Sequence, residues 1–300
     1  MKTYKINLEI YSSIMTPFQA DTIFGHLCWA IAHQEGNKEL ERFLEPFRSG
    51  DPPFIVSDGF PGDLLPKPLT AEFIIDKPEE RKEWKKINYL NLNDFNCIRR
   101  GEKCKPQIVE DLVKISSMPH NIINRLTNTT LSEAGVYSLK EISISNIGIY
   151  LKVVSEEWKD RVEDLLREVS KAGFGRKKSI GKGQFSVLKT TEFNFQNVDQ
   201  ANGFVTLSNF CPGENDPIEG VYTTFVKYGK LGEEFTFSGN PFKKPLVMFK
   251  SGSVFKTDGN PKAFYGRAIT DGIAPAKPEV IQYAYAFAVP IKYPQIKRNL

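Results

Sequence analysis

Two amphipathic helical stretches, each following an alternating strand pattern, constrain the fold of this chain most strongly. Residues 2–11 alternate polar and apolar side chains, which predicts a strand with one buried face. Residues 22–34 carry apolar side chains at helical spacing, and Asp21 is expected to cap that helix. Strand-like residues 136–154 precede a second helix, which is expected to end at Gly173. These two strand–helix pairs predict a fold that combines helices with a sheet.

A further strand is predicted over residues 184–195, so the order is strand, helix, strands, helix, strand. That is the β-α-β-β-α-β order of ferredoxin-like folds. A helix over residues 38–48 and a short strand over residues 54–57 fit between the first helix and the central strands. Residues 71–105 are polar and weakly periodic, which indicates an insertion rather than a part of the core.

The second half of the chain is predicted to consist mostly of strands. These strands cover residues 204–209, 221–228, 245–250 and 282–290. We therefore expect an α+β chain with a first domain over residues 1–200 and a second, strand-rich domain over residues 201–300. The strand pattern leaves open whether the second domain is a degenerate ferredoxin-like unit.

Charge is segregated along the chain. The formal net charge is +4, which is too small to indicate a nucleic-acid partner by itself. Residues 170–190 contain no acid, and residues 239–267 contain only Asp258, whereas acids concentrate in residues 156–168. The two acid-poor segments are therefore expected to carry local positive potential.

One of these segments, residues 173–185, is rich in glycine and reads GFGRKKSIGKGQF; we call it the glycine-rich loop. Glycine permits positive φ and lets a ligand approach backbone N–H groups, which bind phosphate oxygens beside cations. The spacing fits neither a P-loop nor a dinucleotide-binding fingerprint. The alternative is a flexible basic turn. The candidate RNA contacts in this loop are Gly173, Gly175, Arg176, Lys177, Lys178, Gly181, Lys182 and Gly183.

A second candidate site lies within residues 117–137. We expect these residues to form a loop at a sheet edge, with Ile122, Ile123 and Leu126 anchored in the core. Its polar side chains can hold phosphate, 2′-hydroxyl groups or base edges. The alternative is a polar loop whose Asn side chains bond their own backbone. The candidate RNA contacts here are His120, Asn121, Asn124 and Arg125.

Other site types have little support in the sequence. The four cysteines are widely spread without CxxC spacing or paired histidines, so reduced thiols and no metal or cofactor are expected. No apolar run reaches the roughly 20 residues that span a bilayer. The chain begins with a strand pattern rather than a signal peptide, and a cytoplasmic location is expected.

Five segments in order carry a resemblance to a known family. Residues 173–185 have the form of the glycine-rich loop of the RAMP superfamily of CRISPR proteins. The other four segments are TPFQADTIFGHLCWAI (residues 16–31), PPFIVSDGFPGDLLPKPL (52–69), HNIINRLTNTT (120–130) and KKPLVMFKSGSVF (243–255). Together they resemble the Csm-type RAMP subunits that cap the guide end of type III-A CRISPR effector complexes.

The resemblance implies two ferredoxin-like (RRM-like) units and a role in antiviral defence. It implies binding of the repeat-derived 5′ tag of the guide RNA (crRNA) within a ribonucleoprotein. It also implies contact with a large polymerase-like (palm-domain) subunit and an adjacent backbone RAMP subunit. Ser251 and Gly252, in the last of the five segments, are carried over as RNA-binding residues. A hairpin that wedges between guide bases is expected, and residues 71–105 are the expected place for it.

Catalysis is the alternative to a scaffold role. Some RAMP relatives cut RNA with a histidine, and this chain has His26, His33 and His120. Metal-independent cleavage needs an acid and a base on either side of the scissile phosphate. No such pair is evident, so no catalytic residue is predicted and the chain is not expected to be an enzyme. A guide-RNA processing endoribonuclease and a protein-only scaffold without RNA contacts remain as alternatives.

Overall fold

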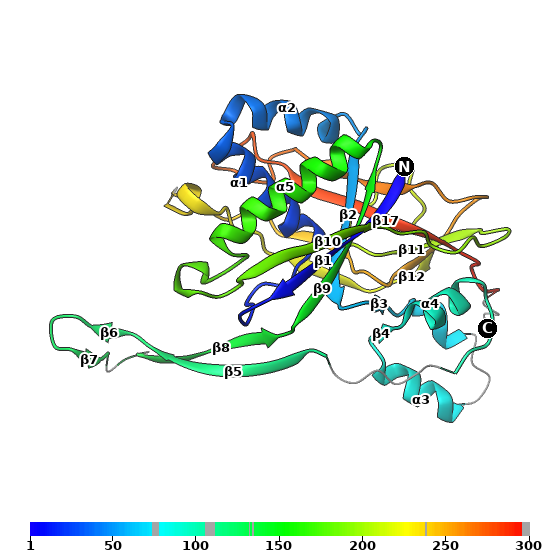
Figure 1. Ribbon diagram of the computed structural model, residues 1–300, viewed down its shortest axis with the longest axis horizontal. Coiled ribbons are helices and arrows are strands. Elements are labelled where there is room, and N and C mark those ends of the chain that lie inside the picture. Colours follow the sequence, from blue (N-terminus) through cyan, green and yellow to red (C-terminus); the bar gives the residue numbers. More distant parts are fainter. Residues whose placement is uncertain (74–77, 106–111, 132, 134, 238, 296–300) are drawn as a thin grey trace.

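The computed structural model describes residues 1–73, 78–105, 112–131, 133, 135–237 and 239–295. Its centre is an antiparallel sheet of four strands, in the order β10-β1-β9-β2 (Figure 1). These strands are β1 (Lys2–Ile10), β2 (Phe54–Pro61), β9 (Asn146–Val153) and β10 (Phe185–Glu192). β10, the last of these four strands in the sequence, therefore lies beside β1, with β9 and β2 on the other side of β1.

Three helices accompany this sheet: α1 (Ala20–Gln34), α2 (Asn37–Arg48) and α5 (Glu156–Ala172). All three match predicted helices, because their apolar stripes are regular. Gly173 ends α5 with a φ of +83°, as predicted. The predicted cap of α1 is wrong: Gln19 occupies the N-cap, and Asp21 lies inside the first turn with its side chain buried.

A second sheet has five strands in the order β12-β15-β11-β17-β16. It covers the face of the first sheet that the helices leave open. The long strand β17 is buried along nearly its whole length. Two of its short strands, β15 and β16, were not predicted from the sequence. The strands are β11 (Gly203–Thr206), β12 (Gly220–Val221), β15 (Val254–Lys256), β16 (Phe264–Ile269) and β17 (Gln282–Ile291).

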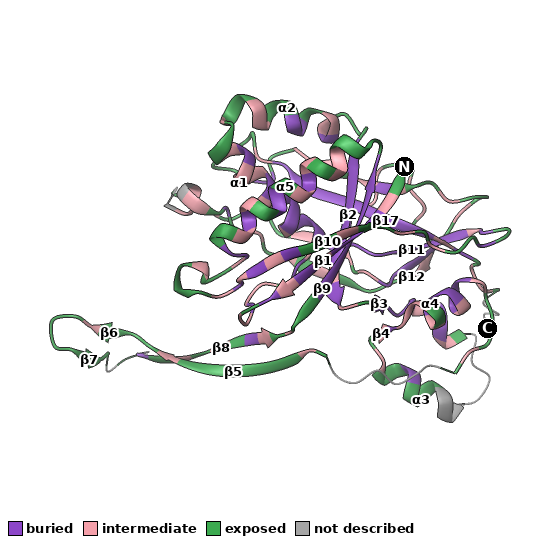
Figure 2. Cartoon of the chain, viewed as in Figure 1, coloured by how far each residue is buried: buried purple, intermediate pink, exposed green. Residues whose placement is uncertain are grey.

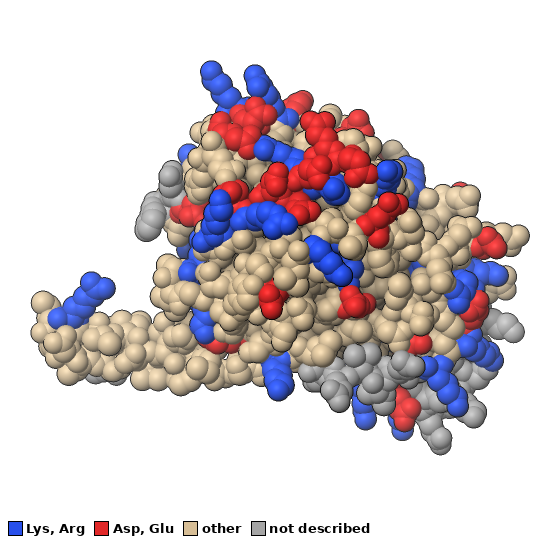
Figure 3. All heavy atoms as spheres, in the orientation of Figure 1, with Lys and Arg blue, Asp and Glu red and all other residues tan. Residues whose placement is uncertain are grey.

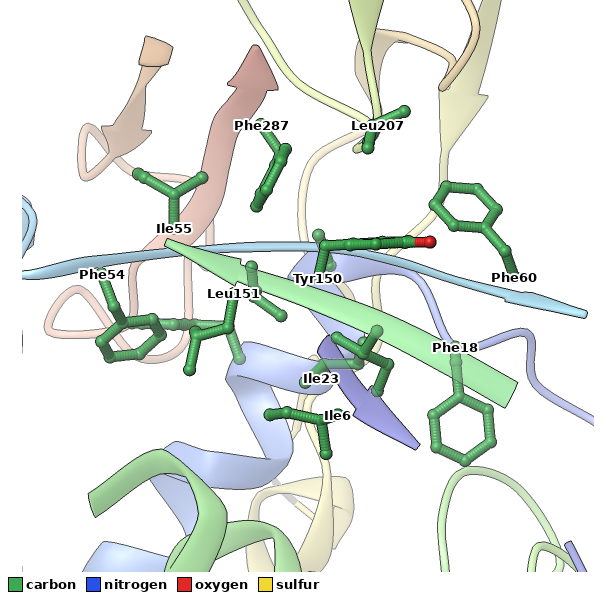
Figure 4. Packing of buried hydrophobic residues seen from close by; sticks show 14 of the residues in the cluster. Ile6, Phe18, Ile23, Phe54, Ile55, Phe60, Tyr150, Leu151, Leu207 and Phe287 are labelled. Atoms are coloured by element: carbon green, nitrogen blue, oxygen red, sulfur yellow. The ribbon is translucent and has the colours of Figure 1, made fainter. Parts of the chain in front are cut away.

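The two sheets and the helices share one hydrophobic core. Figure 4 shows Ile6, Ile23 and Leu151 on the helix side of the first sheet, and Tyr150 and Phe287 between the sheets. The predicted combination of helices with antiparallel sheets is thus observed. The division at residue 200 stays a prediction, since the core continues across it.

The predicted insertion contributes to this core, which corrects the expectation that it lies outside. It contains α3 (Pro78–Lys86), β4 (Tyr89–Leu90) and α4 (Leu92–Arg99). The turn η1 (Leu69–Phe73) begins just before it, and β3 (Leu65–Pro66), which pairs with β4, precedes it. Trp84, Leu90, Phe95 and Ile98 are buried. Residues 74–77 of the predicted insertion lie outside the described residues.

The projecting hairpin is elsewhere than predicted. It is formed by β5 (Lys114–Asn121) and β8 (Val136–Ser143), with β6 (Ile123–Asn124) and β7 (Thr129–Thr130) near its tip. Figure 1 shows it extending away from the body, and Figure 2 shows that most of its described residues are exposed. The expectation of a hairpin within residues 71–105 is therefore wrong, because that segment folds onto the body.

Candidate RNA-binding surface

The glycine-rich loop follows α5 and contains one short turn, η2 (Lys178–Ile180). Its four glycines all have positive φ, between +70° and +83°. A Cβ at Gly183 would lie 2.0 Å from the carbonyl oxygen of Phe174, and one at Gly175 would lie 2.5 Å from Thr16. Gly181 has open space around it. The loop is thus a defined structure, and only part of its glycine content serves tight packing.

His26 on α1 holds this loop in place. The Gly175 N–H donates to the His26 Nε2 atom at 3.1 Å. The centres of the His26 and Phe174 rings lie 4.5 Å apart. Burial, together with nearby Lys178, lowers the pKa of His26 to about 4, which favours the neutral acceptor form. The ring of His33 instead packs near the ring of Trp29, with the two ring centres 5.4 Å apart. Both contacts are of the kind that positions structural histidines.

The four cations of the loop divide into two pairs. Lys178 forms an ion pair with Glu233, and Lys182 forms one with Glu141 at 2.7 Å. Arg176 and Lys177 are exposed and have no ion pair within the part of the chain that the structure describes. The two free cations are therefore the members of the predicted set best placed to meet an anion.

Glu141 also joins the base of the hairpin to the loop. Its carboxylate accepts from the Ser13 hydroxyl at 2.7 Å, and Lys182 donates to the same hydroxyl at 2.8 Å. The Lys182 ammonium and the Ser13 hydroxyl hold the pKa of Glu141 below its usual range. Ile14 pairs with Ile142 by two backbone hydrogen bonds. The base of the hairpin is thus joined to the glycine-rich loop.

The polar residues of the hairpin lie on and near its tip, rather than in a loop at a sheet edge. His120 stacks against Tyr137 with ring centroids 5.6 Å apart. The Asn124 side chain accepts from the Leu126 backbone N–H, as the polar-loop alternative expected, whereas Asn121 donates to the Thr130 hydroxyl. Arg125 is exposed. Near its tip, the hairpin therefore presents the exposed cation Arg125 and the His120–Tyr137 ring pair.

The predicted apolar anchors in this segment are wrong. Leu126 is 95% exposed, and Ile122 and Ile123 are 45% and 55% exposed. The sequence spacing suggested an inward face, but a two-stranded ribbon that projects from the body has no core behind it. These side chains instead form an apolar tip.

Ser251 and Gly252 lie at the junction of β2, β11 and the segment before η1. The Ser251 hydroxyl bonds to the carboxyl group of Asp58, whose pKa is raised to about 7 by burial. The Gly252 N–H donates to Thr206, and its carbonyl accepts from Leu69. Gly252 is buried and both of its backbone groups are used within the fold. Their predicted RNA contact stays a prediction.

Sequence reasoning missed a buried polar cluster around Asp21. Its carboxylate accepts from Asn209 at 3.0 Å and Gln282 at 2.8 Å, and it pairs with Lys227 at 2.9 Å. This cluster ties α1 to the second sheet. The partners lie about 190 to 260 positions away along the chain. The one sign of them in the sequence is a polar residue, Asp21, on the inward face of α1, because a buried carboxylate needs partners.

The charge distribution separates two regions of the face seen in Figure 3. Acidic side chains gather over the upper part, where α2 and α5 lie, and the hairpin shows few charges. Among the described residues, no group of three or more His, Cys, Asp or Glu side chains could hold a metal ion. The described part of the chain also has no helix both long and apolar enough to cross a membrane.

Comparison with known proteins identified relatives by structure alone. No sequence family and no curated protein matches the chain. The structure is similar to the Csm1-Csm4 cassette in complex with pppApA, with a TM-score of 0.66, 19% identity, and coverage of 98% of this chain and 100% of that one. The Csm3-Csm4 subcomplex of the type III-A CRISPR-Cas interference complex gives a TM-score of 0.63, 13% identity and the same coverage. Csm4 is the component common to both assemblies, and the chain shares the fold seen in these Csm4-containing structures.

Proposed function

We propose that this chain is a non-catalytic RNA-binding subunit of a type III-A CRISPR interference complex, acting in the cytoplasm in antiviral defence. It holds the repeat-derived 5′ tag of the guide RNA and docks the large polymerase-like subunit and a neighbouring backbone RAMP subunit. The observation that carries the proposal is the Lys182–Glu141 contact, which joins the glycine-rich loop to the hairpin. The Csm4-like fold supports the same role, because its relatives were solved with Csm1 and with Csm3.

In this proposal the loop and the hairpin have different tasks. Arg176 and Lys177 contact phosphates, because they project without ion pairs. Arg125 and the apolar tip of the hairpin contact the strand farther along, where exposed Leu126 fits between unstacked bases better than between phosphates. The two ferredoxin-like units of residues 1–200 and 201–300 provide the rigid support for both.

A nuclease role has weaker support. His26 is engaged with the Gly175 N–H, and His120 is stacked on Tyr137. Within the described residues, neither has an acid and a base arranged on opposite sides of an open site. A positioned phosphate would therefore lack the pair of groups that general acid–base cleavage needs.

Binding isotherms of the purified full-length chain test the proposal. The ligands are a guide RNA with its 5′ tag, and the same RNA with the tag replaced by an unrelated sequence of equal length. We expect tighter binding of the tagged RNA at equal salt, because the loop and the hairpin contact the tag together. Equal affinity for both ligands would contradict the tag assignment, and no measurable binding would favour a protein-only scaffold.

A further inference from the structure

A second cationic surface lies outside the loop and the hairpin. Residues 220–232 and 239–250 contain five lysines and no acid. They include β13 (Thr224–Lys227) and β14 (Leu246–Phe249), which pair as a separate two-stranded sheet. The pairing extends through a hydrogen bond from Lys243 to Gly229 at 2.9 Å and a bridge between Lys230 and Phe242. We call these two segments the cationic ribbon.

The five lysines of the ribbon form two groups, according to whether their side chains are turned inward or exposed. Lys227 is turned inward to Asp21, and Lys243 donates to Gln282 at 2.9 Å, so both belong to the buried polar cluster. Burial lowers the pKa of Lys243 to about 8. Lys230, Lys244 and Lys250 are exposed. Three exposed cations therefore remain on the ribbon, and the Lys250 ammonium lies 5.8 Å from the centre of the Phe225 ring.

Aromatic rings are exposed among these cations. Tyr228 is 74% exposed and Phe242 is 58% exposed, and the Lys230 ammonium lies 5.8 Å from the centre of the Phe242 ring. Val226 and Val247, which pair across the two strands, are exposed beside them. Exposed rings interleaved with cations, without acids, are typical of surfaces that bind single-stranded nucleic acid by stacking and phosphate contacts.

The chemistry favours a nucleic acid over a protein on this surface. The central part of a protein–protein interface is depleted in lysine, whereas here lysines stand beside the rings. A polyanion with planar bases satisfies both features at once, since phosphates pair with the lysines and bases stack on the rings.

The ribbon is also continuous with the glycine-rich loop. Its two strands are joined by a segment that contains Glu233, and Glu233 pairs with Lys178 of the loop. The same segment lies on α1, where the Trp29 ring contacts Phe235 at 5.2 Å. An RNA strand bound by Arg176 and Lys177 would therefore lie next to the end of the ribbon.

We infer that the cationic ribbon is a second binding site for single-stranded RNA, in which Tyr228 and Phe242 stack on bases and Lys230, Lys244 and Lys250 contact phosphates. The inference extends the proposed function, because the RNA passes from the glycine-rich loop onto the ribbon. The part of the RNA beyond the glycine-rich loop is thus bound by the second half of the chain.

The test compares the variant Tyr228→Leu/Phe242→Leu with the conservative variant Tyr228→Phe/Phe242→Tyr in the full-length chain. Leucine keeps an apolar side chain but removes the ring. We expect the leucine variant to bind tagged guide RNA at least about fivefold more weakly, and the conservative variant to bind it like the wild type. Thermal unfolding of both variants is expected to match the wild type, because both side chains are exposed. Photocrosslinking of RNA containing 4-thiouridine should label the cationic ribbon.

Two results would overturn the inference. One is unchanged RNA affinity in the leucine variant together with no crosslink to the ribbon. The other is unchanged RNA affinity with loss of the large subunit on purification, which would make the ribbon a protein interface. Arg176→Ala/Lys177→Ala, measured in parallel, reports on the loop alone. If only that variant loses affinity, the proposed function stands and the ribbon site is wrong.

Discussion

Gly181 and Gly183 lie two residues apart in the glycine-rich loop and have different surroundings. Both have positive φ, at +82° and +70°. A Cβ at Gly183 meets the backbone of Phe174 at 2.0 Å, whereas nothing lies within 4 Å of a Cβ at Gly181. Gly183 is therefore required by packing inside the fold, and Gly181 by backbone conformation at an open surface.

Alanine at these two positions should separate folding from binding. We expect Gly183→Ala to lower the free energy of unfolding by about 2 kcal/mol or more, because backbone atoms must move. Gly181→Ala should cost about 1 kcal/mol, the strain of a left-handed residue. In free energy, Gly181→Val should cost more in RNA binding than in unfolding, since it adds bulk to the open surface of the loop that carries Arg176 and Lys177. Urea unfolding and RNA isotherms check this, and equal stability losses at both positions would contradict it.

His26 gives the loop a pH dependence. Its pKa in the folded chain is about 4, below the ordinary 6.5, so the unfolded chain binds more protons between these values. The stabilisation is complete above pH 6.5 and is lost as the pH falls toward 4. Between pH 7 and pH 5 we expect the contribution of His26 to the free energy of unfolding to fall by about 1–2 kcal/mol.

The matched variant is His26→Gln, which keeps an acceptor for the Gly175 N–H but does not titrate. The difference between wild type and variant isolates His26, because Asp58 and the other titrating groups are common to both. We expect this difference to shrink from pH 7 to pH 5 in urea unfolding. A difference that stays constant with pH would mean that His26 is not held neutral by the fold.

The hairpin is the element whose removal is most informative. Replacing residues 117–140 with Asn-Gly joins Ser116 to Glu141, which are directly opposite in the two strands, by a two-residue turn. The contacts of Glu141 with Ser13 and Lys182 are retained. The described hairpin residues are mostly exposed, so we expect the melting temperature to change by less than about 3 °C. Affinity for tagged guide RNA should fall, and a shortened chain that binds like the wild type would remove the hairpin from the RNA site.

Elements with a strong local period were predictable from the sequence, and elements without one were not. The strands β1 and β9 and the helices α1 and α5 repeat apolar residues with one period over most of their length, and β17 is an almost continuous apolar run. The insertion was misjudged because Trp84, Phe95 and Ile98 are scattered among charged residues. The hairpin was misplaced because its strands have no buried face to impose an alternation.

The candidate site was predictable only in part for a related reason. Glycine spacing and missing acids identified the loop without any structure. The ion pairs that occupy Lys178 and Lys182 involve Glu233 and Glu141, which are distant along the chain. Pairing over such separations depends on the tertiary fold, so the sequence could not tell the free cations from the bound ones.

For the whole molecule, we expect no hydrolytic activity. Purified chain incubated with repeat RNA, with or without divalent metal ions, should leave the RNA intact, because no histidine has a paired acid and base among the described residues. Gel analysis after long incubation checks this. Cleavage that disappears in His120→Ala or His26→Ala would instead establish the processing endoribonuclease.

The salt dependence of RNA binding tests the central claim most directly. Arg176 and Lys177 are proposed as phosphate contacts, while Lys178 is occupied by Glu233. For Arg176→Ala/Lys177→Ala we expect the slope of log affinity against log salt to become shallower by about 1.4, or 0.7 per contact on a single strand. The control Lys38→Ala/Arg42→Ala removes the same charge on α2, far from the hairpin in Figure 1, and should keep the wild-type slope. An unchanged slope in the loop variant, or an equal change in the control, would contradict RNA binding by the glycine-rich loop.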